Sequence, residues 1–136
     1  MNNPFDGFKV ISSYTRERAI GDGVLRDVSA LAKESGFAVP VAMTSAAWME
    51  AVSWSQSNEA FQDETGRLWD VLIMAKFAAT RPQGRRSEES PRSSFSVYRV
   101  PNISDATEAT ELALDMHIGP GDDGAPVITI MLEHED

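Results

Sequence analysis

The C-terminal third of this chain carries the pattern that most restricts its fold. Apolar and polar residues alternate over residues 111–118, and residues 127–132 form a second stretch rich in β-branched side chains. Between them lie residues 119–124, whose sequence GPGDDG favours a turn. An alternation of period two on both sides of a turn is typical of paired antiparallel strands. The sequence therefore predicts a β-hairpin.

One face of this hairpin is expected to be buried. The apolar positions that share this face are Leu112, Leu114, Met116, Ile118, Ile128, Ile130 and Leu132. The other face of the first strand carries Glu111, Ala113, Asp115 and His117. Because a sheet with one apolar face needs a covering layer, we expect other elements of the chain to pack on it.

Signals for three short helices fill the first half of the chain and offer such a layer. We expect helices over residues 15–20, 29–34 and 46–55, with Gly36 ending the second. Side-chain oxygens would accept the free N–H groups of their first turns. The capping candidates are Thr15, Asp27 or Ser29, and Thr44 or Ser45.

The remaining segments are predicted to be extended or irregular. Residues 8–11 and 95–100 are expected to be strands, and residues 37–43 to be extended because they contain a proline. Residues 80–94, rich in Arg, Ser and Pro, are expected to form a mobile, solvated loop. Residues 102–110 are expected to be a polar connection.

Residues 68–79 are compatible with a strand or a helix. A strand would place Trp69, Val71, Ile73, Ala75 and Phe77 on one apolar face, whereas a helix would be apolar nearly all round. Residues 63–66 before this segment resemble a turn. We favour a long strand. The predicted fold is then a single two-layer α+β domain over residues 1–136, with N-terminal helices packed on a C-terminal antiparallel β-meander that ends in the hairpin.

The composition restricts the class of function. The net charge of −9 disfavours direct binding to a phosphate backbone, which depends on neutralisation by Lys and Arg. The absence of cysteine excludes disulfides and thiolate metal sites. The N-terminus lacks the pattern of a secretory signal, and no apolar stretch is long enough to cross a bilayer. We therefore expect a soluble cytoplasmic protein without membrane contact.

Charge is distributed very unevenly along the chain. From Pro101 to the C-terminus there are nine carboxylates and neither Lys nor Arg, whereas residues 81–99 carry five Arg against two Glu. An acidic surface repels nucleic acid and attracts basic partners. Together with one exposed tryptophan as an anchor, the carboxylates predict a partner-binding surface. Its predicted residues are Asp115, Asp122, Asp123, Glu133 and Trp54.

No motif predicts catalysis, a cofactor or a metal. The glycine-rich residues 119–124 are followed by neither a helix nor a lysine, so a plain turn explains them better than a phosphate-binding loop. The spacing of Asp122 and Asp123 matches no calcium-binding loop. No nucleophile–histidine–carboxylate arrangement follows from the spacing of Ser, His and Asp.

Two alternative sites remain open. A small enzyme or ligand-binding protein would use a site between helices and sheet formed by Tyr14, Arg16, Arg67 and Asp70, although an Asp70–Arg pair that fixes the fold is a simpler explanation of those charges. In the second alternative, the Arg-rich loop from Arg81 to Arg92 would contact nucleic acid. It contains no interleaved aromatic residues, which weakens that hypothesis.

Several segments resemble a family of small uncharacterised acidic proteins carried on bacterial plasmids and other mobile elements. The resembling stretches are residues 11–16 (ISSYTR), 22–25 (DGVL), 27–29 (DVS), 66–72 (GRLWDVL), 119–124 (GPGDDG) and 126–132 (PVITIML). The resemblance implies an accessory role on a mobile element in the bacterial cytoplasm. It implies no activity and transfers no functional residues.

The leading hypothesis is a non-enzymatic acidic interaction protein of a mobile element. It would bind a basic host or plasmid protein, and one version is a defence inhibitor that competes with nucleic acid for that protein. Plain solubility is the simpler reason for an acidic surface. An exposed sheet edge would also support a homodimer.

Overall fold

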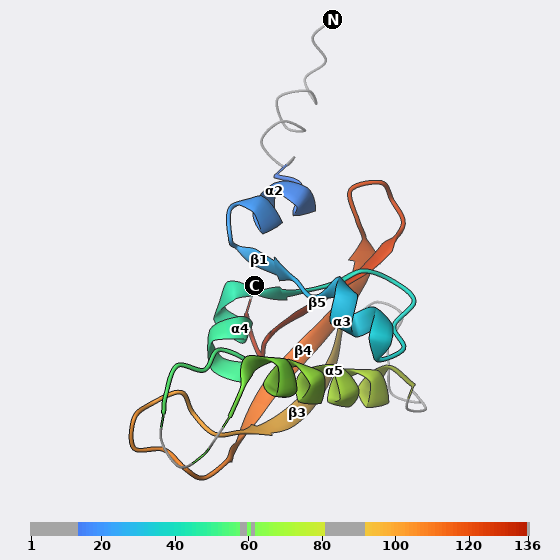
Figure 1. Cartoon of the computed structure of the whole chain (residues 1–136). Helices are drawn as coiled ribbons and strands as arrows, with labels where there is room; N and C mark the ends of the chain where they lie inside the picture. Colours follow the sequence, from blue (N-terminus) through green and yellow to red (C-terminus); the bar gives the residue numbers. More distant parts are fainter. Residues whose placement is uncertain (1–13, 58–59, 61, 81–91, 136) are drawn as a thin grey trace, which may run out of the picture.

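The computed structural model describes residues 14–57, 60, 62–80 and 92–135 (Figure 1). The strand predicted at residues 8–11 and most of the loop predicted at residues 80–94, including the arginines at 81, 85 and 86, lie outside the described residues.

A mixed five-stranded sheet organises the described chain. Its strands are β1 (Leu25–Asp27), β2 (Val41–Thr44), β3 (Arg92–Arg99), β4 (Thr110–Pro120) and β5 (Pro126–Leu132). Their order across the sheet is β1-β2-β5-β4-β3. Only the pairing of β2 with β5 is parallel, and the three other pairings are antiparallel.

The predicted hairpin is confirmed as β4 and β5. Leu114 and Met116 on β4 and Ile130 on β5 are fully buried, as the alternation requires. The turn closes through a hydrogen bond of 2.7 Å from Gly121 N–H to Ala125 O. Alternation in the sequence was therefore sufficient to identify these strands and their buried face.

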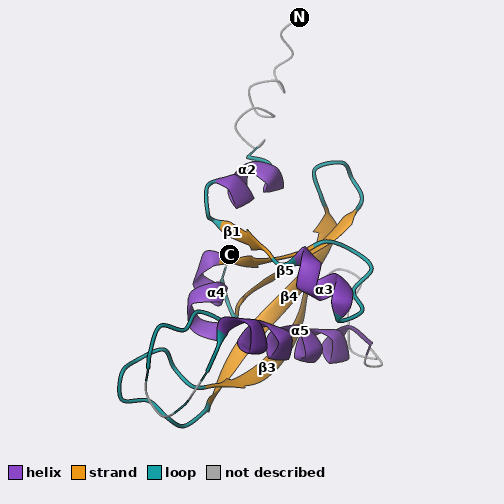
Figure 2. Ribbon diagram, viewed as in Figure 1, coloured by secondary structure: helices purple, strands orange, loops and turns teal. Residues whose placement is uncertain are grey.

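The described chain has four helices. They are α2 (Arg16–Gly21), α3 (Ser29–Glu34), α4 (Ser45–Ala51) and α5 (Glu64–Thr80). The last three cover one face of the sheet, whereas the first lies beyond β1 at the upper end of the molecule (Figures 1 and 2). Thr15 caps α2 and Thr44 caps α4 through their side-chain oxygens, as predicted. The third predicted helix ends at Ala51 rather than near Ser55, and Asp27 Oδ1 accepts the Ser29 N–H at the start of α3.

The strand predicted over residues 68–79 is wrong, because these residues belong to α5. The buried positions recur at the three- and four-residue spacing of a helix, and they are Leu68, Val71, Leu72, Ala75 and Ala78. The predicted turn at residues 63–66 is instead the helix start, where Asp63 Oδ1 accepts the Gly66 N–H at 2.7 Å. Trp69 and Phe77, expected on the apolar strand face, are exposed.

The α+β fold class is confirmed, but the sheet is not confined to the C-terminal half. Val41, Ala42 and Met43 of β2 are fully buried and pair alongside β5, which extends the sheet into the N-terminal half. The core lies between the sheet and α3, α4 and α5. Within the described ranges, no helix has both the length and the apolar character needed to cross a membrane.

Candidate partner-binding surface

Asp115, the first of the predicted partner-binding residues, lies inside the protein. Its carboxylate accepts a hydrogen bond from Ser94 Oγ at 2.9 Å and pairs with Arg92 Nη1 at 3.3 Å. Only 7% of the residue is exposed. Asp115 therefore ties β4 to the edge strand β3 and offers no free charge to a partner.

Asp122 and Asp123 lie at the tip of the hairpin and contribute to local structure. Asp122 accepts the backbone N–H groups of Arg16 at 2.8 Å and Glu17 at 3.0 Å, so it holds the first turn of α2. These hydrogen bonds lower the pKa of the Asp122 carboxyl. Asp123 Oδ1 accepts the Ala125 N–H at 3.0 Å and stabilises the turn.

Replacing Asp122 with Ala is expected to lower the melting temperature at pH 7 and to have a smaller effect at pH 3. Because the folded-state pKa of Asp122 is lowered, its carboxylate stabilises the fold above the ordinary Asp pKa near 3.8. That stabilisation is lost as the pH falls through the folded-state value. Thermal melts of D122A and wild type at both pH values measure the effect. Glu34→Ala, at an exposed carboxylate, is the control, and equal melting of D122A and wild type at pH 7 would contradict the capping role.

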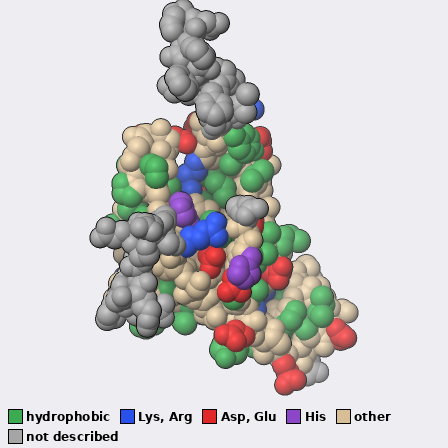
Figure 3. Space-filling model, turned by 180° about the vertical axis from the view of Figure 1, so that it is seen from behind, with side chains coloured by type: hydrophobic (Ala, Val, Ile, Leu, Met, Phe, Trp, Pro, Cys, Tyr) green, Lys and Arg blue, Asp and Glu red, His purple; other side chains and the backbone are tan. Residues whose placement is uncertain are grey.

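Glu133 lies at the opposite end of β5 from Asp122 and joins other carboxylates there. Its N–H donates to Ala113 O at 3.3 Å, which places it beside the start of β4. The exposed carboxylates at this end, here called the acidic end, are Asp105, Glu108, Glu111 and Glu133. Figure 3 shows Asp and Glu side chains gathered over the lower end of the molecule, where the β3–β4 connection lies.

The acidic end carries charge that is little compensated within the described ranges. No described Lys or Arg forms an ion pair with its carboxylates, and the Glu133 carboxylate lies 3.7 Å from His134 Nε2. The predicted acidic surface is thus divided: its free charge lies at this end, whereas the hairpin tip uses Asp122 and Asp123 for internal hydrogen bonds.

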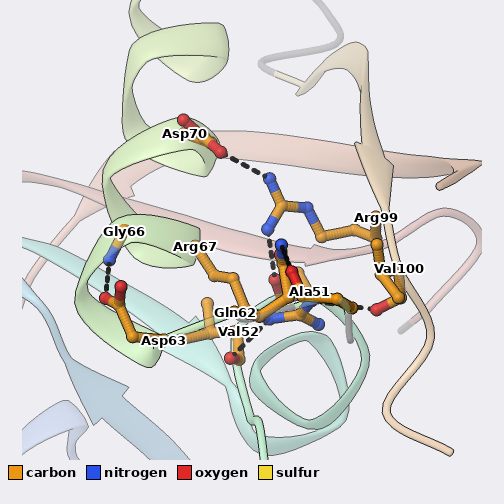
Figure 4. Close-up of polar contacts among 10 residues, drawn as sticks. Ala51, Val52, Gln62, Asp63, Gly66, Arg67, Asp70, Arg99 and Val100 are labelled. Atoms are coloured by element: carbon orange, nitrogen blue, oxygen red, sulfur yellow. Dashed lines mark hydrogen bonds and ion pairs between the residues drawn. The ribbon is translucent and has the colours of Figure 1, made fainter. Parts of the chain in front are cut away.

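Arg67 is a buried cation at the junction of α5, α4 and β3 (Figure 4). It is 1% exposed, and it donates to Val52 O at 2.8 Å and to Val100 O at 2.9 Å. Burial, and then the like charge of Arg99, lower the pKa of Arg67 to about 10. Its guanidinium also lies 5.0 Å from the centre of the Trp54 ring, so Trp54 packs over this cation and is partly buried.

Asp70 forms an ion pair with Arg99 rather than with Arg67. Arg99 Nη2 lies 3.1 Å from Asp70 Oδ2, and Arg99 also donates to Ala51 O at 3.3 Å (Figure 4). The arginine side chain is 6% exposed and the aspartate side chain 65%. The pair fastens α5 to β3 and leaves much of the carboxylate open to solvent.

The alternative ligand site is not assembled in one place. Tyr14 donates to Asp22 at 2.8 Å, and Arg16 donates to Thr129 Oγ1 at 2.7 Å and to Ile128 O at 2.6 Å. These contacts belong to α2, at the other end of the molecule from Arg67 and Asp70 (Figure 1). The four residues therefore have separate structural partners.

A groove runs between α5 and the edge strand β3, close to the Asp70–Arg99 pair. It has a volume of about 400 Å³, and Trp69, Ile73 and Met74 form its helical wall. Residues 96–99 of β3 form the other wall. Trp69 is 39% exposed and Tyr98 is 69% exposed, an unusual exposure for aromatic side chains. Aromatic residues beside a groove are typical of protein-binding surfaces.

The sequence did not predict this groove, because the strand interpretation of residues 68–79 placed Trp69 and Met74 on opposite faces. A helix brings Trp69, Ile73 and Met74 to one side. A helical interpretation of residues 68–79 would therefore have placed these three apolar residues together. Arg99 was visible only as the last member of a basic run.

A family model described as a family of unknown function (DUF6573) matches residues 1–136, and the chain belongs to this family. No curated protein and no solved structure shows a significant match.

Proposed function

We propose that this protein is a non-enzymatic interaction protein that binds a basic protein partner through its acidic end. The observation that carries the proposal is the exposure of Asp105, Glu108, Glu111 and Glu133 with no Lys or Arg paired to them in the described chain. Unpaired surface carboxylates attract a positively charged surface and speed its association.

The biological setting proposed is that of an accessory protein of a mobile element, acting in the bacterial cytoplasm. This part rests on the resemblance of residues such as 66–72 and 126–132 to proteins carried on plasmids. A nucleic-acid-binding host protein fits the chemistry of the acidic end, because such proteins display the basic surfaces that carboxylates complement. Occupying that surface would inhibit a defence protein.

Neutralising three glutamates of the acidic end is expected to weaken partner capture at least tenfold. The test variant is E108Q/E111Q/E133Q, and the matched control E17Q/E34Q/E50Q removes the same charge from exposed positions outside the acidic end. Each protein is immobilised and challenged with nuclease-treated bacterial lysate at low and moderate salt. A basic protein retained by wild type and by the control, but not by the test variant, supports the proposal. Equal retention by the two variants would contradict a specific acidic site and leave only a general charge effect.

A further inference from the structure

Strand β3 forms one edge of the sheet in the described chain. The hydrogen bond from Glu133 N–H to Ala113 O shows that odd-numbered residues of β4 direct their backbone groups toward β5. Because direction alternates along an antiparallel strand, the even-numbered residues of β4 face β3. Their partners are Ser93, Phe95, Val97 and Arg99. The N–H and C=O groups of Ser96 and Tyr98 therefore point away from the sheet.

These free backbone groups lie beside the groove described above. Ser96 and Tyr98 line it on the strand side, and the apolar side chains of Trp69, Ile73 and Met74 line it on the helix side. A segment added to the edge would thus find backbone hydrogen-bonding groups next to an apolar wall. Strand addition at an exposed edge uses this combination of backbone bonds and alternating side-chain pockets.

Between Arg92 and the inward-pointing Arg99, which lie at its two ends, this edge lacks features that normally prevent strand addition. Proteins protect exposed edges with proline, lysine, inward-pointing charge or a β-bulge. Residues 93–98 contain neither proline nor a charged residue, and their pairing with β4 runs without interruption. In the part of the chain that the structure describes, no strand pairs with the outer edge at Ser96 and Tyr98.

We propose that the groove between β3 and α5 binds an extended segment of the basic partner as a sixth strand of the sheet. This inference rests on the proposed function for the charge of the partner. The exposed carboxylate of Glu111, which lies opposite Tyr98 on β4, complements a basic segment, whereas Asp70 in the groove is already paired with Arg99. Side chains of the added strand alternate between two environments, so the preferred segment alternates apolar residues with Arg or Lys. Its apolar residues would contact Trp69, Ile73 and Met74.

A ten-residue peptide of alternating Val and Arg is the probe. At saturation we expect amide hydrogen exchange at Ser96 and Tyr98 to slow at least tenfold, because both N–H groups would gain partners. Two further peptides are N-methylated, one at every Val and the other at every Arg. Backbone N–H groups alternate direction along a strand, as side chains do. One methylated peptide should therefore lose at least tenfold in affinity and the other should bind nearly as well as the parent.

Two substitutions at one position separate the backbone from the side chain. Ser96→Pro removes the outward N–H without touching the hydrogen bonds between β3 and β4, and a peptide affinity at least tenfold lower is expected. Ser96→Ala keeps the N–H, so its affinity should equal that of wild type. If S96P does not fold, the pair of methylated peptides still decides between strand addition and contact through side chains alone.

Several results would overturn the strand-addition inference. One such result is a peptide that binds without protecting the Ser96 and Tyr98 amides and that loses affinity for E108Q/E111Q/E133Q. It would agree with the proposed function and show that the groove is not the binding site. Protection that rises with protein concentration in the absence of peptide would identify a second copy of this chain as the occupant. Absence of peptide binding would also overturn it. Binding at the edge that is unchanged in E108Q/E133Q, which keeps Glu111, would support the groove and count against the acidic end.

Discussion

Replacing Arg67 with Met is expected to lower the free energy of unfolding by about 2–4 kcal/mol, since each buried polar group left without its hydrogen bond costs about 1–3 kcal/mol. The guanidinium bonds to Val52 O and Val100 O, which join the end of α4 and the end of β3 to α5. Methionine fills a similar length but donates no hydrogen bond. Removing the buried charge offsets part of this loss of stability, because the charges of Arg67 and Arg99 no longer repel each other.

Urea denaturation of R67M measures this effect, and Arg18→Met is the matched control. Arg18 is exposed on α2, so its loss should change stability by less than about 0.5 kcal/mol. An R67M protein as stable as wild type would show that Arg67 is not needed to hold the three elements together. That result would also reopen Arg67 as a residue kept for ligand binding.

Replacing Leu72 with Ala is expected to cost about 2–5 kcal/mol, the usual range for a large-to-small change in a packed core. Leu72 is fully buried on the sheet-facing side of α5, whereas Phe77 is 66% exposed. Phe77→Ala should therefore cost less than about 0.5 kcal/mol. A strand over residues 68–79 would reverse the order, because it places Phe77 on the apolar face and Leu72 on the mixed one.

Urea denaturation of L72A and F77A decides between the two arrangements. A larger loss in F77A than in L72A would contradict the helix. Circular dichroism of F77A provides the control for folding, since an exposed substitution should leave the helical signal unchanged.

The sequence predicted the fold where local patterns agree with tertiary packing. The hairpin was found because alternation and turn residues coincide, and the caps of α2 and α4 because Thr15 and Thr44 directly precede their helices. Helix α5 was missed because residues 68–79 are apolar at every position except Asp70 and Lys76, so periods of 2 and 3.6 both fit. Only the partners on the sheet decide which face is buried.

The candidate surface was harder to predict because its residues are separated in the sequence. Asp115 looked like a surface carboxylate until Arg92 and Ser94 were placed beside it on β3. Asp122 bonds to residues more than 100 positions away. Such pairings satisfy charge inside the protein and leave no trace in local spacing. The acidic run after Pro101 therefore indicated the sign of the charge correctly but not which carboxylates remain free.

The association rate of the captured partner as a function of salt tests the proposed interaction most directly. If the acidic end guides a basic protein, the rate should fall about tenfold or more between about 20 mM and 300 mM salt, because screening shortens the reach of the charges. The fall should be shallower for E108Q/E111Q/E133Q than for E17Q/E34Q/E50Q. A rate that does not change with salt, or that falls equally in both variants, would contradict binding through the acidic end.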